Sequence, residues 1–113
     1  MKLYISIPIT GRTIEEAKQH AENIKATLTP YGYECITPFD VCPGTDKPYA
    51  YYMGRDIEEL LSDDIDGIVL GIGYYESKGC RLEEATAVIY EKHIVHECNF
   101  YATDFQTLKT SYL

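Results

Sequence analysis

The stretch that most constrains the fold is residues 67–72, Gly-Ile-Val-Leu-Gly-Ile, the most hydrophobic run in the chain. Apolar and polar side chains do not alternate in this run, so the strand that it predicts is buried on both faces. Strands of this kind lie in the centre of parallel sheets that helices cover on both sides. We therefore expect an α/β fold with residues 67–72 as a central strand.

Other strand and helix patterns alternate along the chain. Strands are predicted at residues 2–7, 33–37 and 93–96, and helices at about 14–28, 51–62 and 79–91. Such alternation is typical of right-handed βαβ units with parallel strands. We expect a flavodoxin-like or Rossmann-like three-layer sandwich whose parallel sheet has four to five strands in the order 2-1-3-4-5. The tail, 98–113, is expected to add a short strand and a helix around 104–109, and the 113 residues are expected to form a single domain, 1–113.

Local signals mark the ends and inner faces of the helices. Thr13 followed by Glu16 has the form of a capping box, and Pro30 with Gly32 predicts the end of the first helix. This helix has an apolar stripe at helical spacing: Ile14, Ala17, Ala21, Ile24 and Leu28. The third helix is predicted to turn four apolar residues inward: Leu82, Ala85, Val88 and Ile89. Residues 38–50 are predicted to be an irregular loop, which serves either as a lid or as an ordinary surface loop.

Charge and residue usage argue against several classes of protein. A formal net charge of −8 disfavours binding of a nucleic-acid polymer, which needs clustered Lys and Arg. No apolar run approaches the roughly 20 residues that span a bilayer, and no signal peptide is evident, so no membrane association is expected. The four cysteines form no C-x-x-C pair, and because no export signal is evident we expect them to be reduced thiols in a cytoplasmic protein. His93 and His96 would point to opposite faces of a strand, so we expect neither a metal nor a cofactor.

The predicted strand order places a ligand site at the carboxyl edge of the sheet. Ligands of open α/β sheets bind where the winding direction changes, which here falls between the strands at 2–7 and 67–72. The loops at 8–12 and 73–79 border this crevice. Side chains from these two loops are therefore the first candidates for ligand contacts.

Acidic side chains near this crevice suit chemistry at a glycosidic bond. Asp56 lies early in the second helix, and Glu83 and Glu84 lie about one turn into the third, where a helical wheel does not choose between them. One carboxylate can attack or stabilise an anomeric carbon while another handles a proton. Tyr4 could orient the nucleophile, or it could be an ordinary core tyrosine. The helix dipole also favours acidic residues near a helix start without any catalytic role.

Two further features leave their interpretation open. Ser77 is a candidate N-cap, and Gly79 would let a ligand approach backbone amides that attract a hydroxyl, phosphate or carboxylate group. Tyrosines are abundant and cluster at Tyr49, Tyr51 and Tyr52 and at the pair Tyr74 and Tyr75. They are interpreted either as packing at a subunit interface or as a wall on which a base stacks.

Three segments occur together in this chain: Tyr-Ile-Ser-Ile-Pro-Ile-Thr-Gly at 4–11, Met-Gly-Arg-Asp-Ile at 53–57 and Ser-Lys-Gly-Cys-Arg-Leu-Glu at 77–83. They resemble the nucleoside 2-deoxyribosyltransferase-like superfamily, in particular its small bacterial and phage branch. The likeness covers roughly residues 2–95, and its most specific part is the pattern Ser-x-Gly-x-x-x-Glu. The superfamily includes transferases that exchange bases between deoxyribosides and hydrolases that cut the N-glycosidic bond of deoxynucleoside monophosphates.

The resemblance implies an enzyme that cleaves or transfers at the N-glycosidic bond of a nucleoside or nucleotide. The spacing of the Ser-x-Gly-x-x-x-Glu pattern would make Glu83, and not Glu84, the nucleophile at the anomeric carbon. Asp56 would assist proton transfer to the base and hold the sugar, and Tyr4 would orient Glu83. The alternatives are a non-catalytic nucleotide-binding module and an interaction protein on the same fold.

The same resemblance implies which residues bind the substrate, a small-molecule nucleoside or nucleotide. Ser77 and the Gly79 amide would hold its 5′ end, Ile7 would lie close to the sugar, and Thr10 and Gly11 in the first loop would also bind the substrate. The superfamily usually has Gly where Ile7 stands, so a narrower ribose pocket is expected, and the hydrolases have a phosphate-binding Arg where Thr10 stands. A homo-oligomer is also implied, because superfamily members often complete the site with a neighbouring subunit.

Overall fold

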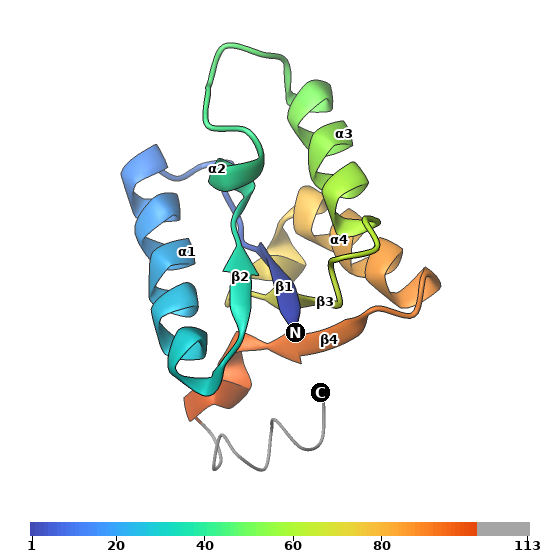
Figure 1. Cartoon of the computed structure of the whole chain (residues 1–113). Coiled ribbons are helices and arrows are strands. Elements are labelled where there is room, and N and C mark those ends of the chain that lie inside the picture. The colour runs from blue at the N-terminus through green and yellow to red at the C-terminus, as the bar shows by residue number, and fades with distance from the viewer. Residues whose placement is uncertain (102–113) are drawn as a thin grey trace.

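The computed structural model describes residues 1–101, and a four-stranded sheet lies at its centre. The strands are β1 (Lys2–Ser6), β2 (Glu34–Ile36), β3 (Gly67–Leu70) and β4 (His93–His96), in the order β2-β1-β3-β4 (Figure 1). All neighbouring pairs are parallel, and Tyr4 is in register with Ile36 on one side and with Ile68 on the other. The predicted order of the first four strands is confirmed.

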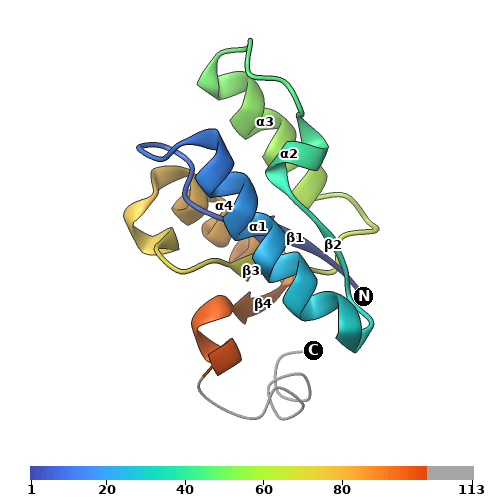
Figure 2. The ribbon, with the colours of Figure 1, turned by 90° about the vertical axis from the view of Figure 1, so that its left-hand side faces the viewer.

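Helices cover both faces of this sheet. α1 (Ile14–Leu28) lies on one face, and α3 (Tyr49–Leu60) and α4 (Lys78–Ile89) lie on the other (Figures 1 and 2). One apolar cluster joins α1 to β1 and β2, and a second joins α3 and α4 to β1 and β3. The fold is therefore the predicted flavodoxin-like or Rossmann-like three-layer α/β sandwich.

β3 has the surroundings that its sequence predicts. All four of its residues are buried, and the strand pairs with β1 and β4. At the start of β3 a Cβ on Gly67 would lie 2.7 Å from the carbonyl oxygen of His93, so a larger residue has no room there. A continuous apolar run thus identified the centre of the sheet correctly.

Polar residues set the ends of α1. Thr13 is its N-cap, and the Thr13 hydroxyl accepts a hydrogen bond from the backbone N–H of Glu16 at 3.1 Å. The inner face buries Ala17, Ala21, Ile24 and Leu28 as predicted, with Ile14 half-buried. After α1 comes a 3₁₀ turn, η1 (Thr29–Tyr31), which ends at Gly32 in the left-handed conformation with φ 89°.

The prediction of an irregular loop over 38–50 was wrong at both ends of that range. Residues 38–41 form a short helix, α2 (Pro38–Val41), and α3 begins at Tyr49. A complete capping box explains α2, because the Thr37 hydroxyl accepts from the N–H of Asp40 while the Asp40 carboxylate accepts from the N–H of Thr37.

The predicted inner face of α4 was also wrong. Leu82, Ala85, Val88 and Ile89 are exposed, and the buried residues of α4 are Cys80, Glu83 and Ala87. The helix is rotated about its axis so that Glu83 points into the protein, where it forms two hydrogen bonds with β1. These polar contacts decide the rotation, since the helix has apolar residues on both of its faces.

Two more 3₁₀ turns complete the described chain. η2 (Tyr74–Glu76) lies between β3 and α4, and η3 (Glu97–Tyr101) follows β4. Residues 98–101 therefore do not begin the expected fifth strand, and the helix expected around 104–109 lies outside the described residues. Within residues 1–101, no helix has the length and apolar character needed to cross a membrane.

Candidate functional site

A cavity of about 230 Å³ lies at the carboxyl edge of the sheet, between the end of β1 and the first turns of α3 and α4. Residues from α2 and the loop after it close its outer side. Seven of the eight predicted site residues line this cavity: Tyr4, Ile7, Thr10, Asp56, Ser77, Gly79 and Glu83. The structure therefore brings together residues that lie up to 79 positions apart in the sequence.

Glu83 is the most constrained side chain of the cavity. It is 4% exposed, and its two carboxyl oxygens accept hydrogen bonds from the Tyr4 and Ser6 hydroxyls, each at 2.7 Å. Burial raises the pKa of Glu83 to about 7, although both hydrogen bonds lower it. Glu84 points elsewhere and lies beside Tyr74, whose pKa is raised by burial and by this neighbour. The choice between Glu83 and Glu84 is thus settled for this cavity by geometry.

Tyr4 and Ser6 hold Glu83 from β1. The two side chains lie on the same face of the strand because side chains alternate with period two. Burial and the charge of Glu83 keep the pKa of Tyr4 well above its usual value, so the Tyr4 hydroxyl stays protonated and donates. The contribution of Ser6 was missed in the sequence, although its i+2 spacing from Tyr4 was a signal for it.

Asp56 is the second buried carboxyl of the cavity. It is 8% exposed, and no described residue donates a hydrogen bond to its Oδ1. Burial, followed by repulsion from Glu83, raises the pKa of Asp56 to about 7 despite the nearby Tyr4 hydroxyl. A buried oxygen without a partner is costly, so a ligand with an N–H or O–H group would be favoured at this point.

Ser77 and Gly79 shape the start of α4. The Ser77 hydroxyl is the N-cap and accepts a hydrogen bond from the N–H of Cys80 at 3.2 Å, as the sequence predicts. A Cβ at Gly79 would lie 2.9 Å from the Tyr49 hydroxyl and 3.3 Å from the sulfur of Met53. The small size of Gly79 therefore lets α3 approach α4 closely, in addition to leaving its backbone facing the cavity.

The loop after β1 contributes two of its three predicted site residues to the cavity. Ile7 and Thr10 line the cavity, whereas Gly11 does not and instead turns the loop with φ 84°. Arg12 points away from the cavity, where its guanidinium donates to the carbonyl oxygen of Pro8 at 2.8 Å. Ile7 is 3% exposed, so its branched side chain fills space at the cavity wall.

Comparison with protein families matches residues 1–96 to DUF4406, described as a domain of unknown function. The chain belongs to this family. The match contains the whole of the cavity described above, and no curated protein matches the chain.

In this DUF4406 domain, aromatic and thioether side chains complete the cavity. Tyr49 and Tyr52 line it together with Phe39 and Met53, whereas Tyr74 and Tyr75 lie outside it. Tyr49 and Tyr52 therefore have the position expected of a stacking wall, whereas Tyr51 does not line the cavity. Phe39 was missed because residues 38–41 were predicted to be a loop.

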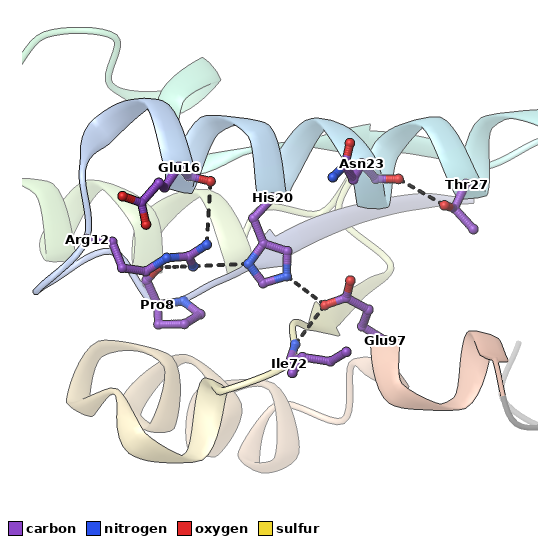
Figure 3. Close-up of polar contacts among 8 residues, drawn as sticks. All are labelled: Pro8, Arg12, Glu16, His20, Asn23, Thr27, Ile72 and Glu97. Carbon is purple, nitrogen blue, oxygen red and sulfur yellow. Dashed lines mark hydrogen bonds and ion pairs between the residues drawn. The ribbon is translucent and has the colours of Figure 1, made fainter.

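A second polar cluster in the DUF4406 domain ties the first loop to α1, to the loop after β3 and to the start of η3 (Figure 3). Arg12 donates to Nδ1 of His20 at 3.1 Å, and Nε2 of His20 lies 2.7 Å from the Glu97 carboxylate. Glu97 also accepts from the N–H of Ile72 at 2.7 Å. Because Arg12 must donate, His20 carries its proton on Nε2 and donates it to Glu97.

This second cluster was not predicted from the sequence, because its members come from four separate segments. Within residues 1–101, no group of three His, Cys, Asp or Glu side chains is arranged to hold a metal ion. The hydrogen bonds of the cluster connect the loop before α1, the loop after β3 and η3. None of its side chains lines the cavity.

Proposed function

We propose that this domain cleaves or transfers at the N-glycosidic bond of a nucleoside or nucleotide, with Glu83 as nucleophile. The observation that carries this proposal is the presence of two buried carboxyls, Glu83 and Asp56, in one cavity, with Glu83 oriented by two hydroxyl donors. The roles follow the resemblance to the nucleoside 2-deoxyribosyltransferase-like superfamily in the segments 4–11, 53–57 and 77–83.

In the proposed first step, an oxygen of ionised Glu83 attacks the anomeric carbon of the sugar. The carbon–nitrogen bond breaks, its electron pair leaves with the base, and protonated Asp56 transfers its proton to the departing nitrogen. Water then opens the glycosyl ester in hydrolysis, or a second base opens it in transfer. Asp56, now ionised, accepts the proton that this incoming group loses, and Glu83 is released as a carboxylate.

The electrostatics of the cavity support this division of roles. Burial favours the protonated form of each carboxyl, and the charge of Glu83 raises the pKa of Asp56 further. One proton held between Glu83 and Asp56 near neutral pH leaves one carboxylate to attack and one acid to donate. Tyr4 keeps its own proton and so remains a donor to Glu83 throughout.

The cavity wall favours an uncharged nucleoside over a monophosphate. Phe39, Tyr49 and Tyr52 offer aromatic faces to a base, and Ser77 at the start of α4 offers a polar contact to the 5′ hydroxyl. The described residues that line the cavity include no Lys, Arg or His, and Arg12 is engaged elsewhere. A dianionic phosphate would thus meet two acidic groups without a cationic partner.

Release of free base tests the proposal. Purified protein is incubated with a panel of deoxynucleosides, ribonucleosides and their monophosphates, with and without a second base, and products are separated by chromatography. Glu83→Gln is expected to reduce base release by about a thousandfold or more, since it removes the nucleophile. Glu84→Gln is the matched control and should retain activity. Base release that survives Glu83→Gln would exclude the mechanism.

Ile7 favours a second candidate, a nucleoside-binding module without turnover. Its side chain lines the cavity where the resembling superfamily usually has Gly. In this case nucleosides would raise the melting temperature of the wild-type protein without any base release. Ile7→Ala would then strengthen nucleoside binding by enlarging the sugar end of the cavity. An unchanged melting temperature with every nucleoside tested would count against this candidate.

A further inference from the structure

The outer face of α4 carries an apolar stripe that the fold does not use. The α4 stripe, defined as Leu82, Ala85, Val88 and Ile89, lies opposite the buried residues of the same helix. Leu82 is 50% exposed, Val88 56% and Ile89 72%. Leu82, Ala85 and Ile89 follow the i, i+3, i+7 spacing of a helix face that packs against another element.

No described residue covers this stripe, so it is an apolar surface in contact with solvent. Contiguous exposed apolar patches of this kind mark interaction sites in soluble proteins, whereas single exposed apolar residues do not. Other exposed apolar side chains lie apart from α4: Ile72 lies in the loop after β3, and Tyr51 lies on α3, where its ring packs edge-on against the ring of Tyr52. The α4 stripe is thus the strongest candidate for an interface.

The charges around the stripe match a second copy of the same helix in the antiparallel direction. Lys78 and Arg81 lie exposed at the start of α4, and Glu91 lies exposed just beyond its end. Within residues 1–101, neither Arg81 nor Glu91 forms an ion pair. An antiparallel arrangement brings each Arg81 near the partner's Glu91, whereas a parallel one places like charges together.

The size of the side chains agrees with this arrangement. Ala85 lies at the middle of the stripe, where a small residue lets two helices approach closely. Around a two-fold axis at Ala85, Leu82 of each copy faces Val88 and Ile89 of the other, so apolar surface is covered on both sides. The chain has a net charge of −8, but this face carries both signs and avoids the repulsion of a uniformly acidic surface.

We propose that the α4 stripe is the contact surface of a two-fold homodimer in which α4 packs antiparallel against α4 of a second copy. Because the opposite face of α4 carries Glu83, this contact would also hold the helix that presents Glu83 to the cavity. The interface is independent of the glycosidic chemistry and can be tested without a substrate.

Sedimentation velocity of the full chain over a range of concentrations measures the assembly. The wild-type protein is expected to reach twice the 12.9 kDa mass of the chain. Leu82→Lys with Ile89→Lys should weaken dimerisation by about a hundredfold or more, since two central apolar contacts are lost. Ile72→Lys, at an exposed apolar residue outside α4, is the matched control and should still dimerise. Circular dichroism confirms that each variant is folded.

A charge exchange tests the antiparallel direction. Arg81→Glu and Glu91→Arg should each weaken the dimer, and the double variant should recover most of the wild-type affinity. A wild-type chain that stays monomeric would overturn the proposal and assign the stripe to a different partner. A dimer that survives the two lysines, or one that Ile72→Lys also abolishes, would overturn it as well, and failure of the double exchange would exclude the antiparallel packing.

Discussion

At the scale of single residues, two opposing effects determine the ionisation of Glu83. Burial raises its pKa, and the hydroxyls of Tyr4 and Ser6 lower it by donating to the carboxylate. The result, about 7, places the titration of Glu83 within the physiological range. Each hydroxyl therefore controls how much of the protein carries an ionised Glu83 at neutral pH.

Ser6→Ala is expected to raise the pKa of Glu83 by about one to two units, because a hydrogen bond to a charged group contributes roughly 1.5–3 kcal/mol. Carbon-detected NMR titration of the side-chain carboxyls measures this directly. Ser6→Thr keeps a hydroxyl at the same position and should restore most of the wild-type value. A Glu83 pKa that is unchanged in Ser6→Ala would show that the Ser6 hydroxyl does not act on it.

The candidate site could be predicted in part from individual residues. The Ser-x-Gly-x-x-x-Glu spacing pointed to Ser77 and Glu83, and the predicted place of Asp56 in the opening turns of the second helix pointed to the same crevice. What could not be predicted was the set of contacts between distant segments. Ser6 was missed although it shares a face of β1 with Tyr4, since its partner is 77 residues away and only the folded sheet identifies it.

At the scale of elements, hydrophobic pattern predicted the strands well and the orientation of α4 poorly. A run such as residues 67–72 has one interpretation, because burial on both faces leaves no alternative. α4 has apolar residues on both faces, so periodicity alone favoured the more apolar one. In the structure the other face of α4 is buried, because Glu83 on that face forms hydrogen bonds with Tyr4 and Ser6. The short helix at 38–41 was likewise set by a capping box, which a proline-rich stretch conceals.

The Glu97 carboxylate connects three elements, because it binds His20 of α1 and the N–H of Ile72 after β3 while lying in η3 (Figure 3). Burial opposes its ionisation, but these hydrogen bonds outweigh burial and lower the pKa of Glu97. A lowered pKa contributes stability that is present above the unfolded value of 4.5 and is lost as pH falls through the folded value.

Glu97→Gln should therefore reduce the free energy of unfolding by about 1–2 kcal/mol at pH 7, since the charged acceptor is lost. The difference from wild type should shrink at pH 4, where Glu97 becomes protonated in the unfolded chain. Urea denaturation at both pH values measures the two differences. Glu22→Gln, at an exposed position of α1, is the control and should change little. An equal loss at both pH values would contradict the electrostatic explanation.

At the scale of the whole molecule, the cavity carboxyls reduce stability above neutral pH. Both Asp56 and Glu83 have folded pKa values raised to about 7, so folding favours their protonated forms. A raised pKa contributes stability that is fully present below the unfolded value and is lost as pH rises through the folded value. The affected window therefore runs from about pH 4 to above pH 7.

Asp56→Asn should flatten this dependence, because the amide cannot ionise. The variant should be more stable than wild type by on the order of 2 kcal/mol at pH 8, and this advantage should decrease toward pH 5. Urea denaturation across this range provides the measurement. Asp63→Asn changes a neighbouring exposed carboxylate and is the matched control. A stability of Asp56→Asn that is below wild type at pH 8 would contradict the prediction.

The proton shared by the buried carboxyls Glu83 and Asp56 also affects the enthalpy that is measured when a ligand binds in the cavity. A ligand whose N–H or O–H group pairs with the Oδ1 of Asp56 stabilises the ionised form of that carboxyl, so binding releases a proton to the buffer. The apparent enthalpy of binding then includes the ionisation enthalpy of the buffer, and it differs between phosphate and Tris at the same pH. Acidification would compete with such a ligand, which makes occupancy of the cavity depend on both ligand concentration and pH.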